Sequence, residues 1–365
     1  MSKFSAADHA FMAHALRLAR RGLNTTTPNP RVGCVLVRDG HVIAEGWHEK
    51  AGLPHAEINA LARVGAGDTA IGATAYVTLE PCSHHGRTPP CADALVTAGV
   101  ARVVAAMQDP NPLVAGQGLA RLAAAGIAVA SGLLEAEAGD LNVGFVSRMT
   151  RGRPWLRLKV AASLDGKTAL NNGVSQWITG PDARRDAHAW RARSCAVLTG
   201  IGTVRDDNPR LTVREVPTER QPLRVVIDSR LETPPDAAIL DGGNVLIAAA
   251  QEDAGRAAAL RARGAEIVVL PNDGGKVELV DLLRELGRRG INEVLAEAGT
   301  RLNGSLLREG CVDELLIYQA PLLIGDAARG MFGLAELGDL AGATRLNIIE
   351  RRAVGADFRI RARFG

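Results

Sequence analysis

The sequence predicts two successive α/β domains, the first of them an α/β/α sandwich. Strand and helix patterns alternate through the first third of the chain in the order β-α-β-α-β, which is typical of a sheet covered by helices. A second alternation of strand and helix patterns begins at residue 155. The chain has 365 residues, which is enough for two domains with complete cores.

The N-terminal elements follow from local signals. Ser5 and Asp8 form a capping box that opens a helix ending near Gly22. Asp39-Gly40 predicts a hairpin turn between two strands. Hydrophobic periodicity predicts strands at 32–37, 41–47, 75–79 and 100–107, and helices at 55–64, 91–98 and 118–125.

A linker is predicted between the two domains. Residues 147–154 are polar and basic and end on Pro154, a composition typical of linkers. The expected domains are therefore 1–147 and 148–365. In the second domain we expect strands at 155–161, 195–199, 223–227, 245–249, 266–270, 293–296 and 314–317, and helices at 182–193, 252–263, 277–288 and 300–308.

Composition argues against two classes of partner. The net charge is only +3, and residues 1–147 carry 11 basic and 12 acidic side chains. A dedicated nucleic-acid binder would carry a basic surplus, so we expect no nucleic-acid partner. No apolar run approaches the roughly 20 residues that span a bilayer, and the N-terminal residues do not form a signal peptide. We therefore expect no membrane association.

The cysteines indicate a reducing compartment. The five cysteines are an odd and sparse set, which is not a disulfide framework. Cys34 and Cys195 lie in apolar runs and are expected to be small core residues. The cytoplasm is the expected location.

A zinc site with deaminase chemistry is the sharpest prediction. His55-Ala56-Glu57 precedes Pro81-Cys82 and then Cys91, which is the residue order of zinc-dependent base deaminases. Imidazole and thiolates are zinc ligands, and bound zinc makes hydroxide available from water at neutral pH. We predict one Zn²⁺ per chain, held by His55, Cys82 and Cys91. Glu57 is predicted to be the general acid/base that carries a proton from water to the leaving amine.

A structural zinc site is the alternative, because a fourth protein ligand would close the coordination sphere. His84 and His85 lie between the two cysteines and could supply it. Eight residues separate Cys82 from Cys91, whereas nucleic-acid deaminases have two at this point. The inserted loop therefore needs its own explanation.

Asn29 is a candidate binding residue on a rigid loop. Pro28 and Pro30 fix their own φ angles and restrict the residues before them. The Asn29 side chain is thereby held in place with both a donor and an acceptor. The sequence leaves open whether this side chain binds a ligand or caps its own turn.

The motifs of the second domain indicate a nucleotide or another phosphorylated ligand. Residues 200–203 begin but do not complete the G-x-G-x-x-G fingerprint, so an ordinary Rossmann domain is not supported. Residues 297–300 join a strand to a helix. The first amides of that helix could bind a phosphate, or the segment could be an ordinary connection without a ligand. The charged run 206–214 is typical of a solvated loop.

Together these motifs resemble one family, the bifunctional deaminase–reductases of riboflavin biosynthesis. The resemblance covers nearly the whole chain in family order, and only about 218–273 is uninformative. It rests on TPNPRVGCV at 27–35, PHAE at 54–57, TLEPCSHHGRTPPC at 78–91, ASLDGKTA at 162–169, SQWIT at 175–179, DDNP at 206–209 and EAG at 297–299.

The resemblance implies two folds and two reactions. A cytidine-deaminase-like N-terminal domain would hydrolytically deaminate 2,5-diamino-6-(5-phosphoribosylamino)pyrimidin-4(3H)-one. A C-terminal domain with a dihydrofolate-reductase-like fold would then use NADPH to reduce the ribosyl group to ribityl, giving 5-amino-6-(5-phosphoribitylamino)uracil. The family also implies homo-oligomers formed through the reductase domain.

The resemblance also assigns residues in the first domain. Asn29, His48 and His84 match positions that line the pyrimidine pocket, and Arg87 matches a basic residue that meets the ribose phosphate. The inserted loop is then explained, because its family counterpart lies over the substrate. A charge-assisted hydrogen bond of this kind contributes roughly 1.5–3 kcal/mol.

For the second domain, the resemblance places Lys159 near the reacting centre. A hydride acceptor needs its proton or positive charge managed at the neighbouring oxygen or nitrogen, and Lys159 and Asp207 are the pair expected to do this. Substrate contacts would fall on Ser175, Arg191, Leu211, Arg214 and Glu297, with Arg191 and Arg214 at the phosphate. NADPH contacts would fall on Ala161, Trp177, Thr203, Asp207, Ser229, Gly299, Thr300, Arg301, Leu302, Asn303, Gly304 and Ser305.

Three other functions stay open at this point. The second domain could bind a nucleotide without reducing anything, although the presence of Lys159, Asp207 and Glu297 speaks against this. The first domain could edit nucleic acid, which its near-neutral charge disfavours. The zinc site could also be purely structural.

Overall fold

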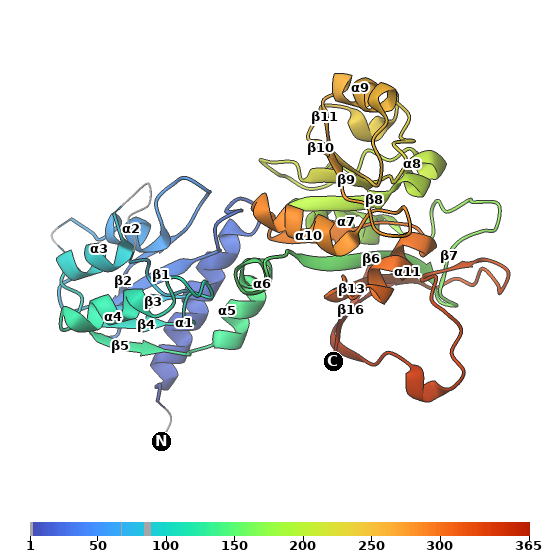
Figure 1. The fold of residues 1–365 in the computed structure, drawn as a ribbon. Coiled ribbons are helices and arrows are strands. Elements are labelled where there is room, and N and C mark those ends of the chain that lie inside the picture. The colour runs from blue at the N-terminus through green and yellow to red at the C-terminus, as the bar shows by residue number, and fades with distance from the viewer. Residues whose placement is uncertain (1–2, 67, 84–88) are drawn as a thin grey trace. The chain divides into compact units, whose positions relative to one another are not determined.

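The computed structural model describes residues 3–66, 68–83 and 89–365. The chain divides into two compact units, Met1–Gly152 and Arg153–Gly365. Each unit has its own sheet, helices and core (Figure 1). The boundary predicted after residue 147 falls inside helix α6 (Val143–Arg151).

The first unit contains a five-stranded sheet in the order β2-β1-β3-β4-β5. Strand β1 pairs antiparallel with β2 and β3, whereas β3, β4 and β5 are parallel. The strands are β1 (Gly33–Arg38), β2 (His41–Trp47), β3 (Thr74–Val77), β4 (Arg102–Ala105) and β5 (Ala128–Ser131). The other helices are α1 (Ala6–Ala19), α2 (Ala56–Leu61), α3 (Cys91–Thr97), α4 (Gln117–Ala124) and α5 (Glu135–Leu141).

Two glycines show that helices α1 and α2 cover opposite faces of this sheet. A Cβ at Gly33 would lie 2.0 Å from the Ala15 carbonyl oxygen of α1, and one at Gly46 would lie 2.4 Å from the Ala60 nitrogen of α2. Gly46 pairs with Cys34, which follows Gly33 on β1. Successive residues of a strand face opposite sides, so the two helices lie on opposite faces. The predicted α/β/α sandwich is confirmed.

The second unit contains a nine-stranded sheet in the order β11-β10-β9-β8-β12-β6-β13-β16-β15. In this spatial order, every neighbouring pair from β11 through β13 is parallel. Strand β16 pairs antiparallel with β13, and β15 pairs antiparallel with β16 at one edge of the sheet. The strands are β6 (Trp155–Ser163), β8 (Ala196–Gly200), β9 (Leu223–Ile227), β10 (Val245–Ala249), β11 (Ala265–Val269), β12 (Glu293–Ala296), β13 (Glu314–Ala320), β15 (Leu346–Val354) and β16 (Asp357–Phe364).

Helices and a small second sheet complete this unit. The helices are α7 (Pro181–Arg193), α8 (Ile201–Asp207), α9 (Ala254–Ala262), α10 (Leu279–Arg288) and α11 (Thr300–Arg308). Strands β7 (Lys167–Ala169) and β14 (Arg329–Gly330) form the separate two-stranded sheet. The mixed α/β fold predicted for this part of the chain is confirmed.

The strand order creates a natural ligand position in the second unit. From β8 the chain moves outward through β9, β10 and β11, and it then returns to place β12 between β8 and β6. In open α/β sheets, ligands bind beyond the carboxyl ends of the strands at such a reversal of order. The segments that follow β8 and β12 are therefore the expected walls of a ligand site.

The structure corrects two local predictions. The linker expected at 147–154 is helical as far as Arg151, and Phe145 and Val146 of α6 pack against the core of the first unit. The charged run 206–214 is not simply a solvated loop, since Asp206 and Asp207 end helix α8. Leu211 and Val213 are buried and anchor the following segment.

No helix within the described part of the chain combines the length and apolar character needed to cross a membrane.

Candidate metal centre and candidate reductase site

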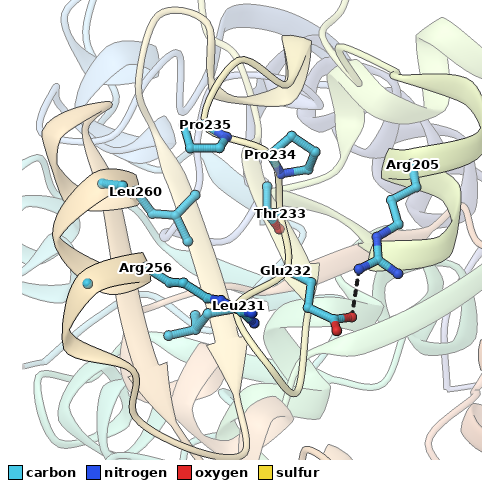
Figure 2. A pocket seen from close by; sticks show the side chains of 10 residues that line it. Arg205, Leu231, Glu232, Thr233, Pro234, Pro235, Arg256 and Leu260 are labelled. Carbon is cyan, nitrogen blue, oxygen red and sulfur yellow. Dashed lines mark ion pairs between the residues drawn. The ribbon is translucent and has the colours of Figure 1, made fainter.

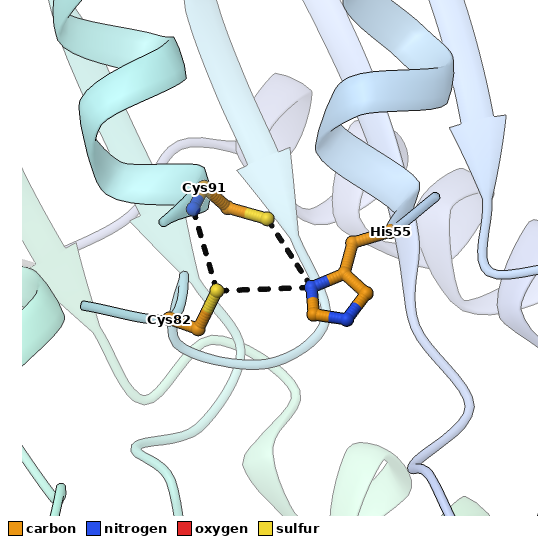
Figure 3. Close-up of side chains that lie close together, drawn as sticks. All are labelled: His55, Cys82 and Cys91. Carbon is orange, nitrogen blue, oxygen red and sulfur yellow. Dashed lines mark hydrogen bonds between the residues drawn. The ribbon is translucent and has the colours of Figure 1, made fainter. Parts of the chain in front are cut away.

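Three residues of the first unit form a group that matches a tetrahedral zinc site. His55 caps α2, Cys91 begins α3, and Cys82 lies beyond the end of β3 (Figure 3). The His55 Nδ1 atom lies 3.7 Å from Cys82 Sγ and 3.3 Å from Cys91 Sγ. Ligand atoms bound at about 2.1 Å (nitrogen) and 2.3 Å (sulfur) around a tetrahedral ion lie about 3.6 Å apart. The donor types and spacing therefore fit zinc.

Backbone hydrogen bonds hold Cys82 beside the N-terminus of α3. The Cys91 amide donates to Cys82 Sγ at 3.3 Å, and the Ala92 amide donates to the Cys82 carbonyl oxygen at 3.1 Å. The pKa of the Cys82 thiol is lowered, first by a hydrogen bond with the Cys91 thiol and also by His55. A thiolate is the form of cysteine that binds a metal.

Glu57 lies next to this group without belonging to it. Among the described residues the metal-ligand group consists of His55, Cys82 and Cys91. Glu57 is in the first turn of α2 and is only 3% exposed. Burial, and then the negative charge of Cys82, raise the pKa of Glu57 to about 7. Such a carboxyl group can both take and return a proton near neutral pH.

A hydrogen-bonded chain joins Asn29 to the same site. The Pro54 carbonyl oxygen lies 3.1 Å from His48 Nδ1, and Asn29 Nδ2 lies 3.1 Å from His48 Nε2. A carbonyl oxygen only accepts, so Nδ1 carries the proton and Nε2 accepts from Asn29. Burial lowers the pKa of His48, which favours this neutral form. The His48 ring packs edge-on against His55, with the ring centres 5.3 Å apart.

Two of the predicted substrate residues, His84 and Arg87, lie outside the described residues, as does His85. Asn29 and His48 are thus the predicted pocket residues that the structure brings to His55.

In the second unit, Glu297 joins two predicted cations. It follows β12 and accepts from Arg191 of α7 at 2.5 and 2.9 Å, and Lys159 Nζ of β6 lies 3.5 Å from its carboxylate. Glu297 is buried, and although burial alone would raise its pKa, the charges of Arg191 and Lys159 lower it to about 2. Arg191 and Glu297 are therefore engaged with each other in this structure. Lys159 pairs with Glu297, and Asp207 instead accepts from Ser175 Oγ at 3.2 Å.

Arg214 is the exposed cation beside this cluster. Its guanidinium donates to Thr212 Oγ1 at 3.1 Å, and no carboxylate among the described residues forms an ion pair with it. Burial and the charge of Arg191 lower its pKa. His188 of α7 positions this segment, because its Nδ1 accepts from the Arg214 amide at 3.1 Å.

The predicted cofactor residues are partly brought together at the reversal of strand order. A Cβ at Gly299 would lie 3.9 Å from Thr203 Oγ1, and one at Gly200 would lie 3.0 Å from Leu302 Cδ2. The segments after β8 and β12 therefore touch. Gly299 caps α11 without a side-chain hydrogen bond, which leaves its first amides available for a phosphate.

Several predicted cofactor residues bind other parts of the protein. Thr300 Oγ1 donates to the Gly330 carbonyl oxygen at 2.6 Å, and Asn303 Nδ2 donates to that of Met331 at 3.0 Å. A Cβ on Gly304 would lie 2.2 Å from the Gly333 carbonyl oxygen. These three residues hold the segment 330–333 against α11. Ser305 accepts from Arg308 at 3.0 Å.

The other predicted residues are more scattered. The Ser229 hydroxyl accepts from the Val277 amide at 3.3 Å. The Trp177 side chain is exposed, with the Arg184 guanidinium 4.6 Å from its ring centre. Leu211 is buried in the core, so its side chain cannot meet a ligand without rearrangement. Ala161 lies on β6, two residues beyond Lys159, and Arg301 lies in the first turn of α11.

A pocket of about 440 Å³ lies beside α8 and α9 (Figure 2). None of the predicted site residues lines it. Its two guanidinium groups already have partners, since Arg205 pairs with Glu232 at 2.7 Å and Arg256 donates to the Arg230 carbonyl oxygen at 2.9 Å. Its chemistry therefore indicates no particular ligand.

Sequence reasoning missed two residues beside these sites. His188 was part of a helix pattern, and nothing in its spacing indicated a bond to Arg214. Glu80 has no predicted role in the motif at 78–91, yet its buried carboxylate accepts four backbone hydrogen bonds. An acidic residue at the end of a buried strand is the signal that could have identified it.

Comparisons with known proteins agree with this geometry. Residues 5–107 match the cytidine and deoxycytidylate deaminase zinc-binding region, and residues 154–359 match the RibD C-terminal domain. The riboflavin biosynthesis protein RibD of Escherichia coli is 51% identical over 363 residues, covering 96% of this chain and 97% of that protein. RibD of Haemophilus influenzae is 48% identical, covering 99% and 98%.

Solved structures extend the match to the whole fold. A structure of Acinetobacter baumannii RibD shares 44% identity with a TM-score of 0.90, covering 98% of this chain and 99% of that one. A Thermotoga maritima deaminase/reductase shares 34% identity with a TM-score of 0.87 and the same coverage. The chain therefore belongs to the RibD family, whose members are bifunctional deaminase/reductase enzymes of riboflavin biosynthesis.

Proposed function

We propose that this enzyme first deaminates 2,5-diamino-6-(5-phosphoribosylamino)pyrimidin-4(3H)-one and then reduces the product with NADPH to 5-amino-6-(5-phosphoribitylamino)uracil. The observation that carries the first step is the arrangement of His55, Cys82 and Cys91 at zinc-ligand spacing, with buried Glu57 beside them. The Thermotoga relative is a diaminohydroxyphosphoribosylaminopyrimidine deaminase and 5-amino-6-(5-phosphoribosylamino)uracil reductase, which supports the choice of substrate.

In the deaminase step, His55, Cys82 and Cys91 would hold zinc, which supplies hydroxide from water at neutral pH. Glu57 takes a proton from the attacking water and returns a proton to the amine, which leaves as ammonia. The raised pKa of Glu57 suits both transfers. Asn29, which donates to His48, is proposed to bind the edge of the pyrimidine. His84 and Arg87 are proposed to add contacts to the base and to the ribose phosphate.

In the reductase step, NADPH would supply a hydride to the carbon of the opened ribose, and a proton must reach the neighbouring heteroatom. Lys159 is the proposed proton donor or charge partner, because it lies in the cluster held by Glu297. Asp207 is a second candidate and is oriented by Ser175. Arg214 is favoured for the substrate phosphate, since Arg191 is already paired with Glu297.

The proposed cofactor position rests on topology. The segments after β8 and β12 meet where the strand order reverses, and Thr203 lies close to Gly299 there. The uncapped start of α11 suits a phosphate of the dinucleotide. The five cysteines are free, which fits the reducing cytoplasm proposed as its location.

Mass spectrometry on zinc-loaded enzyme with the phosphorylated diaminopyrimidinone tests both steps and their order. Without NADPH, we expect one amine to be exchanged for oxygen. With NADPH, we expect the further addition of two hydrogens. Deamination alone under both conditions would indicate that the second domain binds a ligand but does not catalyse reduction. If the substrate is unchanged under both conditions, the zinc site would have to be interpreted as structural.

We also propose that the reductase domain forms homo-oligomers through its outer strand. Strand β15 lies at one edge of the large sheet, and Leu346, Ile348 and Ile349 are 40–48% exposed on it. An apolar edge strand is a template for pairing with another strand. Ile348→Lys is expected to lower the mass measured by light scattering to that of the monomer. Leu113→Lys is the control, since Leu113 is exposed in the other domain. A wild-type monomer would contradict the proposal.

A further inference from the structure

We propose that Glu80 is a positioning residue for the candidate metal centre, because it binds the segment that carries Cys82 to the turn after β4 and to the first turn of α4. The inference rests on the proposed zinc site. Glu80 itself is not a ligand, since it lies outside the group formed by His55, Cys82 and Cys91. Its effect would pass through Pro81, the single residue between Glu80 and Cys82.

The Glu80 carboxylate accepts four backbone hydrogen bonds. One oxygen accepts from the amides of Asp109 at 3.0 Å and Gly116 at 2.9 Å, and the other accepts from those of Gly118 at 2.7 Å and Leu119 at 3.2 Å. The residue is only 5% exposed. The cradle is made of donors alone, so a carboxylate, which only accepts, satisfies all four.

The first turn of α4 also packs closely against Pro81, the residue between Glu80 and Cys82. A Cβ at Gly118 would lie 1.9 Å from the Pro81 carbonyl oxygen and 3.2 Å from Glu80 Cγ. The Glu80 amide also donates to the Met107 carbonyl oxygen at 2.9 Å. Backbone, carboxylate and close packing therefore fix the approach to Cys82 from the β4 side.

The opposite side of Cys82 is fixed by α3, whose first amides bind its sulfur and its carbonyl oxygen. Cys82 is thus held by two sets of contacts. The amides of α3 bind Cys82 directly, and the hydrogen bonds of Glu80 hold the backbone just before it. Metal affinity depends on ligands being held at the correct spacing before the ion binds. Loosening the Glu80 contacts should weaken zinc binding, although every ligand would remain present.

Glu80→Gln tests this inference because it keeps the shape of the side chain but replaces one acceptor oxygen with a donor. That donor would face two amide N–H groups. We expect the dissociation constant for zinc, measured by competition with a chromophoric chelator, to rise about 10-fold or more. Cobalt substituted for zinc should show an altered visible absorption spectrum. Glu137→Gln, an exposed residue of α5, is the matched control.

Gly118→Ala tests the packing of α4 against Pro81 without changing any charge. Gly139→Ala is its control, because no atom lies within 4 Å of a Cβ added at that position. Both test variants should bind zinc more weakly than wild type while the metal-free proteins keep wild-type circular dichroism. Wild-type zinc affinity and cobalt spectrum in Glu80→Gln would overturn the inference. If Glu80→Gln does not fold, the affinity of Gly118→Ala decides in the same way. Failure of the wild-type enzyme to bind zinc would instead refute the proposed zinc site.

Discussion

Replacing Glu57 with glutamine is expected to slow deamination about 10²–10⁴-fold while zinc remains bound. Glutamine has nearly the same shape as glutamate but cannot take a proton from water or return one to the amine. Glu57 lies outside the ligand group, so the affinity for zinc should change little. The measurements are the deamination rate constant at saturating substrate and the zinc content of the purified protein.

Glu137→Gln provides the control, since the same chemical change on the exposed side of α5 should leave both quantities at wild-type values. The reductase step in the Glu57 variant, assayed with substrate that is already deaminated, should also be unaffected. Loss of zinc from the Glu57 variant would show that Glu57 is a ligand. Deamination at the wild-type rate would show that another group carries the proton.

Replacing Glu297 with glutamine should both destabilise the second domain and impair reduction. The change leaves Arg191 and Lys159 largely buried without their shared carboxylate. Removing one partner of a buried ion pair costs about 3–5 kcal/mol of folding free energy. Because Lys159 also loses its position, we expect kcat for NADPH oxidation to fall more than the KM for substrate rises.

The pH dependence of stability distinguishes this role from a general packing defect. Glu297 has its pKa lowered from 4.5 to about 2 in the folded protein. Its ionised form therefore contributes stability that is complete above the unfolded-state value and is lost as pH falls through about 2. The difference in unfolding free energy between wild type and Glu297→Gln should shrink over this window.

Denaturant unfolding followed by tryptophan fluorescence gives that free energy, because three of the four tryptophans lie in the second unit. Glu336→Gln, in an exposed loop, is the control. A stability difference that stays constant from pH 7 down to the acid range would contradict the assigned charge role. Unchanged NADPH oxidation by the variant would show that Glu297 does not position Lys159 for the reaction.

Many local elements of the fold could be predicted from the sequence, although strands β5 and β16 and helices α5 and α6 were among those not predicted. Strands β9, β10 and β12 and helix α11 have the predicted bounds. Such elements depend on periodicity and capping, which are properties of short segments. Helix α8 was missed because its two glycines and its charged end obscure the apolar spacing. Strand β15 was missed because it lies at a sheet edge and lacks a buried face.

The order of His55, Glu57, Cys82 and Cys91 was sufficient to predict the metal centre, because the chemistry of zinc restricts which side chains can serve and in what roles. In the structure, His55, Cys82 and Cys91 lie close enough together to hold a metal ion. The sequence left open whether Asn29 binds a ligand or caps its own turn. Its hydrogen bond to His48 is what connects it to the candidate metal centre.

The sequence by itself predicted the fold class, the candidate metal ligands and the family motifs, because each depends on residue type and short spacing. Only the tertiary structure decided which distant residues act together. Glu297 pairs with Arg191 and Lys159 because β12 lies between β8 and β6. Glu80 accepts a hydrogen bond from the Gly118 amide because the start of α4 packs against the segment that follows β3. These contacts join residues 38 to 138 positions apart, and local spacing carries no information about them.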